Sequence, residues 1–557
     1  MSSQEQPGPH AESGSIGAGS AGRGTSVTKI EVYDTTLRDG AQLEGISLTV
    51  EDKLRIAEQL DWLGVHFIEA GWPGANPKDD EFFRRAPAEL SLPTSTLVAF
   101  GSTRRVKGKV DSDDTLRHLV ESGAGTVCIV GKTWDYHVLE ALQTTLDEGV
   151  AMVRDSVEFL VNAGLGVFFD AEHFFDGYKR NPEFSLRVLE AAATAGATRL
   201  VLCDTNGGTL PFEVEETVRA VVDYFGGDVG VGVHLHDDAG TGVANALAGV
   251  RGGAIQVQGT INGYGERTGN CNLTTIIPNL TLKMGVQTLP PDRMERLTAV
   301  AHHVAELVNM PLNPQAPYVG HSAFAHKAGL HVSAIVKRPD AYEHVEPDAV
   351  GNGTRFVVSE LAGRSTLVMK AKELGLELDG PQLTDVVETL KRLEHEGYHF
   401  EVADGSLELL MRRATGWQPD WFHVESFRVI VDDTRRLDFL TGEEQPGVLT
   451  EATVKVHVGD DRMIATAEGN GPVNALDNAL RRALVHRLPD LARLHLTDYK
   501  VRVLDTQHGT EAVTRVLIDS TDGSTTWTTI GVNENIIEAS WQALLDSIHF
   551  GLLRAHS

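Results

Sequence analysis

Short hydrophobic runs alternate with longer amphipathic stretches from Lys29 to about Gly285. The short runs are rich in β-branched residues and predict strands, and the stretches between them predict helices. The predicted strands are Ile30–Tyr33, His66–Ala70, Thr96–Phe100, Val127–Val130, Val167–Phe169, Leu200–Cys203, Val231–Leu235 and Ile255–Gly259. Regular alternation of strand and helix is typical of a parallel sheet in the α/β class.

The intervening stretches carry helix signals. Apolar residues recur at three- and four-residue spacing over Val50–Leu63, and Thr49 with Asp52 forms a plausible capping box before that run. Pro182–Ala195 and Pro211–Phe225 each begin with a proline, as helices often do. Glycine follows four of the predicted helices, as expected for C-caps, at Gly64, Gly123, Gly164 and Gly196.

Eight strand–helix units in about 255 residues match the count and size of a (β/α)8 TIM barrel. A doubly wound open sheet is the competing architecture. The first strand lacks the Gly-x-Gly-x-x-Gly turn of many such sheets, and polar motifs follow many strands instead of one switch point. We therefore predict a catalytic barrel over residues 28–290, with its active site at the carboxyl ends of the strands.

The chain outside the barrel divides by pattern into three parts. Residues 1–27 are rich in Gly and Ser and predict a disordered leader. Residues 291–419 predict a helical linker domain, and residues 420–557 predict a C-terminal α+β domain with a weak internal repeat. In both halves of the repeat, strands lead through a glycine-bearing turn into a helix, at Gly469–Leu480 and Thr526–Leu544. Such helix N-termini can hold the carboxylate of an amino-acid effector, but tight turns alone explain the glycines equally well.

Composition narrows the class of protein. The chain has 557 residues, 41% of them hydrophobic and 23% charged, and a formal net charge of −29. This charge argues against nucleic acid and anionic membranes as partners, whereas a local cation or arginine still allows anionic small substrates. The sequence shows neither a membrane span nor a secretory signal. Three cysteines in a chain of this length do not form a disulfide framework, so we expect the reducing cytoplasm as the location. Cys128 and Cys203 lie in apolar runs, as core thiols do, and Cys271 lies in a polar loop.

The candidate chemistry centres on Val231-Gly-Val-His-Leu-His-Asp-Asp238. Alternate side chains of a strand share a face, so His234 and His236 point the same way and can bind one cation. Two hydrogen-bonded strand histidines without a metal are the alternative. Asp34-Thr-Thr-Leu-Arg-Asp-Gly40 closes the first strand and supplies Asp39, and only strand eight lies between strands one and seven in a closed barrel. Two imidazoles and a carboxylate with open positions suit Mn²⁺, Zn²⁺, Co²⁺ or Mg²⁺, which would act as a Lewis acid on a chelated 2-oxo acid.

Further polar residues follow other strands. Asn270 ends the Gly-rich loop after strand eight and is a candidate oxygen ligand. Arg38 precedes Asp39 and is placed to stabilise a developing alkoxide, unless it only pairs with Asp34 or Asp39. Glu172 and Thr205, which follow strands five and six, are expected to line the mouth. For Glu69 at the end of strand two, pairing with an arginine such as Arg38 is as good an explanation as catalysis.

These motifs together resemble the metal-dependent Claisen-condensing branch of the pyruvate-carboxylase/hydroxymethylglutaryl-CoA lyase barrel superfamily, which contains the 2-isopropylmalate, homocitrate and citramalate synthases. The resemblance runs from about Thr28 to the C-terminus and includes Gly-Glu-Arg-Thr-Gly-Asn270, His326-Lys-Ala-Gly-Leu-His331 and Leu-Ala-Gly-Arg-Ser365. Three segments are most similar to the citramalate-forming members: Ala70–Pro77, Glu172–Tyr178 and Gly531–Trp541.

The resemblance implies that acetyl-CoA, as co-substrate, condenses with a 2-oxo acid, pyruvate in the citramalate-forming members. By carry-over, Asp39, His234, His236 and Asn270 would hold the metal, and Arg38 would polarise the keto oxygen. Glu172 would help to enolise acetyl-CoA, and Thr205 would bind the substrate carboxylate. His326 and Tyr342 would reach the barrel mouth of a partner subunit, which implies a homodimer. The last domain would bind a branched-chain effector, isoleucine if the product is citramalate.

Three rival interpretations remain at this point. A lyase of the same barrel would use the same metal to cleave a carbon–carbon bond, and only analogy of the later domains argues against it. A 2-isopropylmalate synthase would take 2-oxoisovalerate, since a methyl-sized difference changes discrimination by only about 1–3 kcal/mol. A non-catalytic amino-acid sensor would have no need of Arg38, Asp39, His234 and His236 together.

Overall fold

The computed structural model describes residues 29–326, 334–335, 338–356, 364–437, 444–504 and 512–556. The predicted leader, the segment Lys327–His331 and residues 359–363 of the second linker motif lie outside the described residues. The chain separates into two compact units, one of residues 1–324 and 345–353 and one of residues 325–344 and 354–557. The predicted domain boundaries remain predictions.

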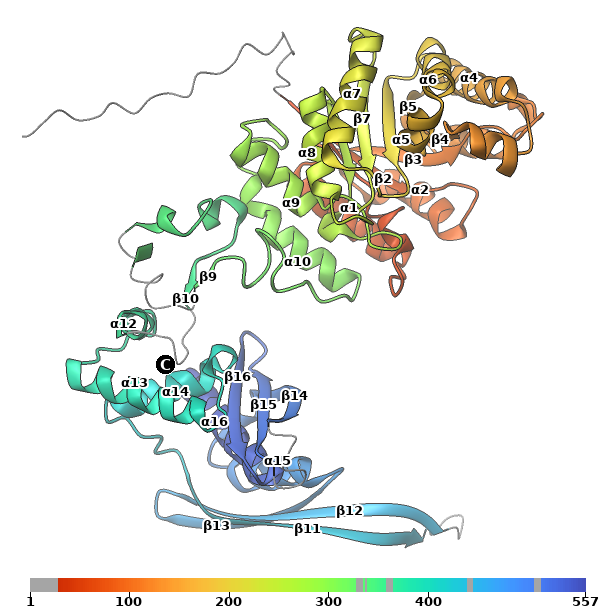
Figure 1. Ribbon diagram of the computed structural model, residues 1–557. Coiled ribbons are helices and arrows are strands. Elements are labelled where there is room, and N and C mark those ends of the chain that lie inside the picture. Colours follow the sequence, from red (N-terminus) through yellow and green to blue (C-terminus); the bar gives the residue numbers. More distant parts are fainter. Residues whose placement is uncertain are drawn as a thin grey trace, which may run out of the picture. The chain divides into compact units, whose positions relative to one another are not determined.

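Eight parallel strands close into a barrel in sequence order, and β8 pairs with β1 to complete it (Figure 1). The strands are β1 (Glu31–Asp34), β2 (Phe67–Gly71), β3 (Thr96–Ser102), β4 (Thr126–Lys132), β5 (Gly166–Glu172), β6 (Arg199–Asp204), β7 (Gly230–Leu235) and β8 (Gln256–Gly259). Each one overlaps a strand predicted from the sequence. The TIM-barrel prediction is confirmed, and closure brings β1 and β7 to the two sides of β8.

Helices surround the barrel and bury its outer face. They are α1 (Val50–Leu63), α2 (Pro77–Glu89), α3 (Asp114–Glu121), α4 (Leu146–Asn162), α5 (Phe174–Arg180), α6 (Pro182–Thr194), α7 (Pro211–Phe225), α8 (Gly242–Gly252), α9 (Leu273–Pro278) and α10 (Leu297–Leu307). The side chain of Thr49 accepts from the Asp52 amide and the Asp52 carboxylate accepts in return, which confirms the capping box. Gly64 ends α1 with φ 94°, where a Cβ would also meet the Pro290 ring at 2.7 Å. A side chain at position 64 is therefore strained in both respects.

The barrel strands have an apolar outer face and a partly polar inner face. Val32 and Ile68 are fully buried in the core that the helices cover. Tyr33 and Cys128 belong to a separate cluster inside the barrel, as strand alternation requires. The inner face also carries Glu69, which is fully buried. A polar interior of this kind can hold the residues of a site in fixed positions.

The second unit contains helices and antiparallel sheets. Its short strands β9 (Ala325–His326) and β10 (Arg355–Phe356) pair in parallel. The helices are α12 (Arg364–Glu373), α13 (Gly380–His395) and α14 (Asp404–Ala414). One three-stranded sheet of β11 (His423–Leu437), β12 (Glu444–Val458) and β13 (Asp461–Gly469) precedes α15 (Pro472–Leu484). A second sheet of β14 (His495–Val503), β15 (Thr514–Thr521) and β16 (Thr526–Asn533) precedes α16 (Ile536–Ala555).

The two sheet-and-helix halves confirm the internal repeat. Gly469 ends β13 and Gly531 lies inside β16, and each packs against the helix that follows its strand. A Cβ at Gly469 would lie 2.4 Å from the Ala475 nitrogen, and one at Gly531 would lie 1.9 Å from the Ala539 carbonyl oxygen. These glycines are required because strand and helix approach closely.

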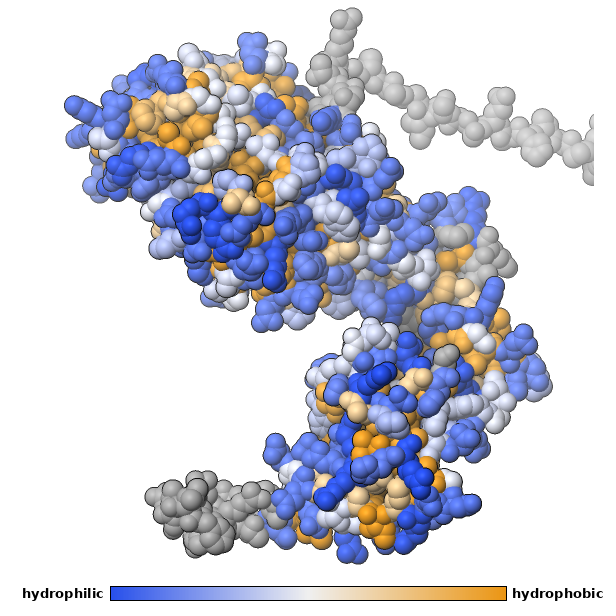
Figure 2. Space-filling model, turned by 180° about the vertical axis from the view of Figure 1, so that it is seen from behind, coloured by the Kyte–Doolittle hydropathy of each residue, from blue (hydrophilic) through white to orange (hydrophobic). Residues whose placement is uncertain are grey.

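Hydrophilic residues predominate on the surface. On the face drawn in Figure 2, they cover most of each unit, and smaller hydrophobic patches are scattered among the hydrophilic residues. Within the described residues, the helices are too short or too polar to cross a membrane.

Candidate metal centre

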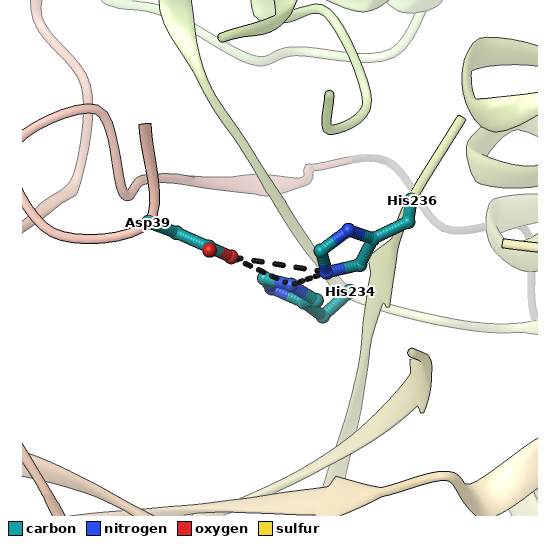
Figure 3. A group of neighbouring side chains, drawn as sticks. All are labelled: Asp39, His234 and His236. Carbon is teal, nitrogen blue, oxygen red and sulfur yellow. Dashed lines mark hydrogen bonds and ion pairs between the residues drawn. The ribbon is translucent and has the colours of Figure 1, made fainter. Parts of the chain in front are cut away.

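Asp39, His234 and His236 meet at the mouth of the barrel. His234 is the penultimate residue of β7, His236 directly follows that strand, and Asp39 lies in the turn after β1. The Nε2 atoms of the two histidines are 3.2 Å apart, and they lie 3.2 Å (His234) and 3.9 Å (His236) from Asp39 Oδ2. Figure 3 shows both rings and the carboxylate pointing toward one another. All three side chains are buried.

The geometry of these three residues fits a divalent cation. Ligand atoms about 2.1 Å from one ion lie roughly 3.0–3.4 Å from each other in octahedral or tetrahedral coordination. Two of the three observed separations, both 3.2 Å, lie within this range, and the third, 3.9 Å, is about 0.5 Å longer. A buried unsatisfied acceptor lies on a neighbouring segment, since the Oδ1 atom of buried Asn270 has no hydrogen-bond partner among the described residues. The backbone of Asn270 pairs with that of His236 in an isolated β-bridge.

The electrostatics of the centre also suit a cation. Burial alone would raise the pKa of Asp39, but Arg38 and the two histidines hold it well below its usual range. Burial and the neighbouring His234 lower the pKa of His236 to about 4, so its ring is neutral near pH 7. Burial opposes protonation of His234, yet its hydrogen bond to Asp39 raises its pKa. A cation bound by these three residues would displace the proton that His234 shares with Asp39.

Arg38 lies beside the centre and is fixed by Glu69. Its Nε donates to Glu69 Oε1 over 2.6 Å, and its Nη1 is 3.5 Å from Asp39 Oδ1. Tyr33 and Thr35 donate to the same Glu69 carboxylate over 2.5 and 2.6 Å. The guanidinium also stacks on Phe100, with its carbon 3.9 Å from the ring centroid. Glu69 therefore pairs with an arginine, which confirms one of its two predicted roles. The pairing holds Arg38 in one orientation.

The centre opens into a cavity of about 220 Å³. Arg38, Glu172 and Thr205 line it, as the sequence predicts. The Thr205 Oγ1 accepts from the His173 amide over 2.9 Å, which leaves its hydroxyl proton for a ligand. Trp72, Phe100 and Val130 form an apolar wall.

His326 and Tyr342 belong to the second unit. His326 ends β9, and its Nε2 lies 3.3 Å from the Glu343 carboxylate, which also accepts from the Thr354 hydroxyl over 2.6 Å. Tyr342 precedes Glu343 and is 48% exposed. Their approach to a barrel mouth stays a prediction.

Several residues of the centre were missed by the sequence analysis. Lys132 ends β4 and pairs with Glu172, and reading every strand end for polar residues would have found it. Arg267 donates to Asp238 over 2.7 and 2.9 Å and to the Thr205 carbonyl over 2.8 Å, so it ties together the loops after β6, β7 and β8. Asp170 and Gln258 lie deeper, on the inner face of β5 and β8, and no local motif marks them. The three cysteines are free and buried, Cys271 included.

Comparisons with known proteins place these observations in a family context. The family described as HMGL-like matches residues 29–304, which span the barrel. The description "homocitrate synthase post-HMGL domain-like" matches residues 318–398, and "LeuA allosteric (dimerisation) domain" matches residues 401–552.

Individual relatives match nearly the whole chain. An (R)-citramalate synthase of Aquifex aeolicus is 51% identical over 528 residues, which cover 94% of this chain and 98% of the relative. An (R)-citramalate synthase of Streptomyces coelicolor is 51% identical over 94% of this chain and 97% of the relative. A probable 2-isopropylmalate synthase of Methanopyrus kandleri is 32% identical over 94% of this chain and 98% of the relative.

Proposed function

The chain belongs to the (R)-citramalate synthase family, and from that premise we propose that it condenses acetyl-CoA with pyruvate and water to (R)-citramalate and CoA. Members of this family are acetyl-CoA-dependent acyltransferases whose acyl group becomes an alkyl group on transfer. The observation that carries the proposal is the convergence of Asp39, His234 and His236 in a chain that is about half identical to such enzymes over nearly its whole length. The product would serve as the first intermediate of a pyruvate route to isoleucine.

Asp39, His234, His236 and Asn270 would hold a divalent metal ion, with the Asn270 Oδ1 as fourth ligand. A bound ion would supply Lewis-acid polarisation of the 2-oxo acid. Mn²⁺, Zn²⁺, Co²⁺ and Mg²⁺ all fit a mixed nitrogen and oxygen set with open positions. The Thr205 hydroxyl can donate a hydrogen bond to the carboxylate of pyruvate.

Arg38 would stabilise the charge that develops on the keto oxygen. Its Nε is engaged by Glu69, its Nη1 lies 3.5 Å from Asp39 Oδ1, and the side chain lines the cavity. A guanidinium held in place before the reaction needs no reorganisation when the alkoxide forms. Arg38 therefore acts on the acceptor, and Glu69 acts only through Arg38.

Glu172 would promote removal of a methyl proton from acetyl-CoA. The resulting enolate carbon bonds to the keto carbon of pyruvate, the keto oxygen takes up a proton, and water then hydrolyses the thioester to release CoA. Lys132 contacts the Glu172 carboxylate and restricts its position at the cavity edge. Glu172, His326 and a water molecule are all candidates for the base itself.

The second unit would complete the enzyme. The dimerisation-domain match supports a homodimer, in which His326 and Tyr342 of one subunit reach the barrel mouth of the other. The Glu343 carboxylate orients His326 for such a role. The same match supports binding of an amino-acid effector, and isoleucine, the end product of this route, is the effector we propose. A cavity of about 690 Å³ between α15 and β14 offers room for it. We also propose a cytoplasmic location, where acetyl-CoA and pyruvate are available.

The alternative acceptor is 2-oxoisovalerate, which a 2-isopropylmalate synthase uses. The cavity of about 220 Å³ with its apolar wall of Trp72, Phe100 and Val130 has room for the alkyl group of either acceptor. Pyruvate is favoured because the identity to the named citramalate synthases is higher, at 51% against 32% for the probable 2-isopropylmalate synthase.

The test is CoA release from acetyl-CoA by the metal-loaded full chain, with pyruvate and 2-oxoisovalerate compared side by side. We expect a strong preference for pyruvate in kcat/KM and (R)-citramalate as the product. A preference for 2-oxoisovalerate would assign the chain to leucine biosynthesis. Release with neither acceptor would contradict a synthase and direct attention to cleavage of 2-hydroxy acids.

A further inference from the structure

Gln258 lies directly beneath the metal centre, on the inner face of β8. Its side chain is fully buried, and its Oε1 atom is 2.9 Å from the Nδ1 atom of His234. His234 thus uses Nδ1 toward Gln258 and Nε2 toward Asp39 and His236. Since each neutral imidazole has one donor nitrogen and one acceptor nitrogen, the group at Nδ1 decides which form faces a metal.

The surroundings of Gln258 fix the orientation of its amide. Its Nε2 donates to the Asp170 carboxylate over 3.2 Å and faces the Gln256 Oε1 at 3.5 Å. Gln256 in turn donates its own Nε2 to the Glu31 carboxylate over 3.2 Å, so its oxygen must face Gln258. A reversed Gln258 amide would set its oxygen against two acceptors. The carbonyl oxygen is therefore the atom presented to His234.

From this arrangement we infer that Gln258 is a positioning residue, which holds the His234 proton on Nδ1 and leaves the Nε2 lone pair directed into the metal centre. This inference rests on the proposed metal site and goes beyond its ligand set. Asp170 serves the same end, because it accepts from the amide over 3.2 Å, whereas the Gln256 oxygen at 3.5 Å is too distant to hold the amide. His236 lacks an equivalent contact, because its buried Nδ1 has no hydrogen-bond partner within the described residues.

The chain offers a matched control for this role. Gln256 lies two residues earlier on β8, shares its inner face, is also fully buried, and has Glu31 and Gln258 as its recorded partners. Gln256→Met removes a buried amide from the same strand but leaves both His234 and Asp170 in contact with Gln258. Gln258→Met removes the acceptor at nearly constant length. Gln258→Glu keeps an oxygen for the His234 Nδ1 proton and can share one proton with Asp170.

The experiment is titration of the metal-free full-length protein with Mn²⁺, with free Mn²⁺ measured by electron paramagnetic resonance. Loss of outer hydrogen bonds to metal ligands weakens affinity by about 10–100-fold, so we expect that increase in Kd for Gln258→Met. We expect the Kd values of Gln258→Glu and Gln256→Met to stay within about threefold of wild type. Circular dichroism and thermal melting of each variant report whether the fold is intact.

The outcomes separate the inference from the proposed function. Wild-type protein that binds no Mn²⁺ would overturn the metal site itself. If wild type binds Mn²⁺ and Gln258→Met binds it with equal affinity, only the inference is overturned. The same holds if Gln258→Met and Gln256→Met weaken Mn²⁺ binding equally. If Gln258→Met does not fold, Gln258→Glu decides, because a folded glutamate variant with lost affinity contradicts an acceptor role.

Discussion

The Arg38–Glu69 pair allows a quantitative prediction of barrel stability. We consider Glu69→Gln, which keeps the shape of the side chain and removes its charge. The Glu69 carboxylate is fully buried and holds Arg38 over 2.6 Å. In the variant, the nearest carboxylate left to Arg38 within the described part of the chain is Asp39, at 3.5 Å.

The magnitude follows from burial. Removal of one partner from a buried ion pair costs about 3–5 kcal/mol, because the other charge is left without compensation. Glutamine retains one acceptor oxygen and Asp39 remains nearby, so we expect the lower end, about 3 kcal/mol. For a domain of barrel size, 1 kcal/mol lowers Tm by about 2 °C, which gives a decrease of about 6 °C.

The assay is differential scanning calorimetry of the full-length protein. We would identify the barrel transition by an upward shift with Mn²⁺ and pyruvate, the proposed ligands of the native barrel. Glu31→Gln is the matched control, since Glu31 pairs with Arg199 through two bonds of 2.6 and 2.9 Å at the opposite end of the strands. Those side chains are 22–23% exposed, and we expect a loss of about 1 kcal/mol or less.

Equal shifts for Glu69→Gln and Glu31→Gln would refute the argument that burial makes the first pair costly. A Glu69→Gln barrel as stable as wild type would show that Arg38 finds another partner. Either result would also remove the reason for treating Arg38 as preorganised.

Three further predictions concern other parts of the chain. Thr49→Ala removes the N-cap of α1 and should cost about 1 kcal/mol, seen as a small decrease in the same calorimetric transition; no decrease would contradict the cap. Arg267→Lys loses the two-point contact with Asp238 and so loosens the loop that carries Thr205. We expect kcat/KM to fall about 10-fold because Thr205 is less well positioned, and the free energy of unfolding to change by less than about 1 kcal/mol. An unchanged kcat/KM would contradict a role of Arg267 in positioning Thr205. Burial lowers the pKa of His549 from 6.5 to about 4, so between these pH values the unfolded state binds a proton that the folded state does not. The free energy of unfolding of the second unit therefore falls by up to about 3 kcal/mol as pH decreases from 6.5 to 4. His549→Gln should flatten this loss in urea unfolding at pH 7, 5.5 and 4.5, and an unchanged slope would assign it to other groups.

Local signals explain why much of the fold was predictable. Thr49 and Gly64 mark both ends of α1, and the observed helix Val50–Leu63 begins and ends where they indicate. The β-branched runs found all eight strands, because a strand buried on both faces reads as a hydrophobic run. Count and spacing then sufficed for a closed barrel, which in turn predicted that Asp39 would meet His234 and His236.

The deeper part of the centre could not be predicted in this way. Asp170 and Gln258 meet across the barrel interior from β5 and β8, and their contact depends on inward orientation and on the relative shift of strands that are not neighbours. Two isolated polar residues in hydrophobic strands carry no motif. Lys132 was within reach, since it stands at a strand end as Glu172 does.

The central claim is that the Asp39, His234 and His236 centre holds the metal on which turnover depends. The most direct measurement is CoA release from acetyl-CoA and pyruvate by protein stripped with a chelator and then titrated with Mn²⁺, for wild type and His234→Ala. We predict that wild-type activity returns with about one ion per chain, and that His234→Ala remains a folded dimer without metal-dependent turnover. Full activity in the folded His234→Ala variant would contradict the account.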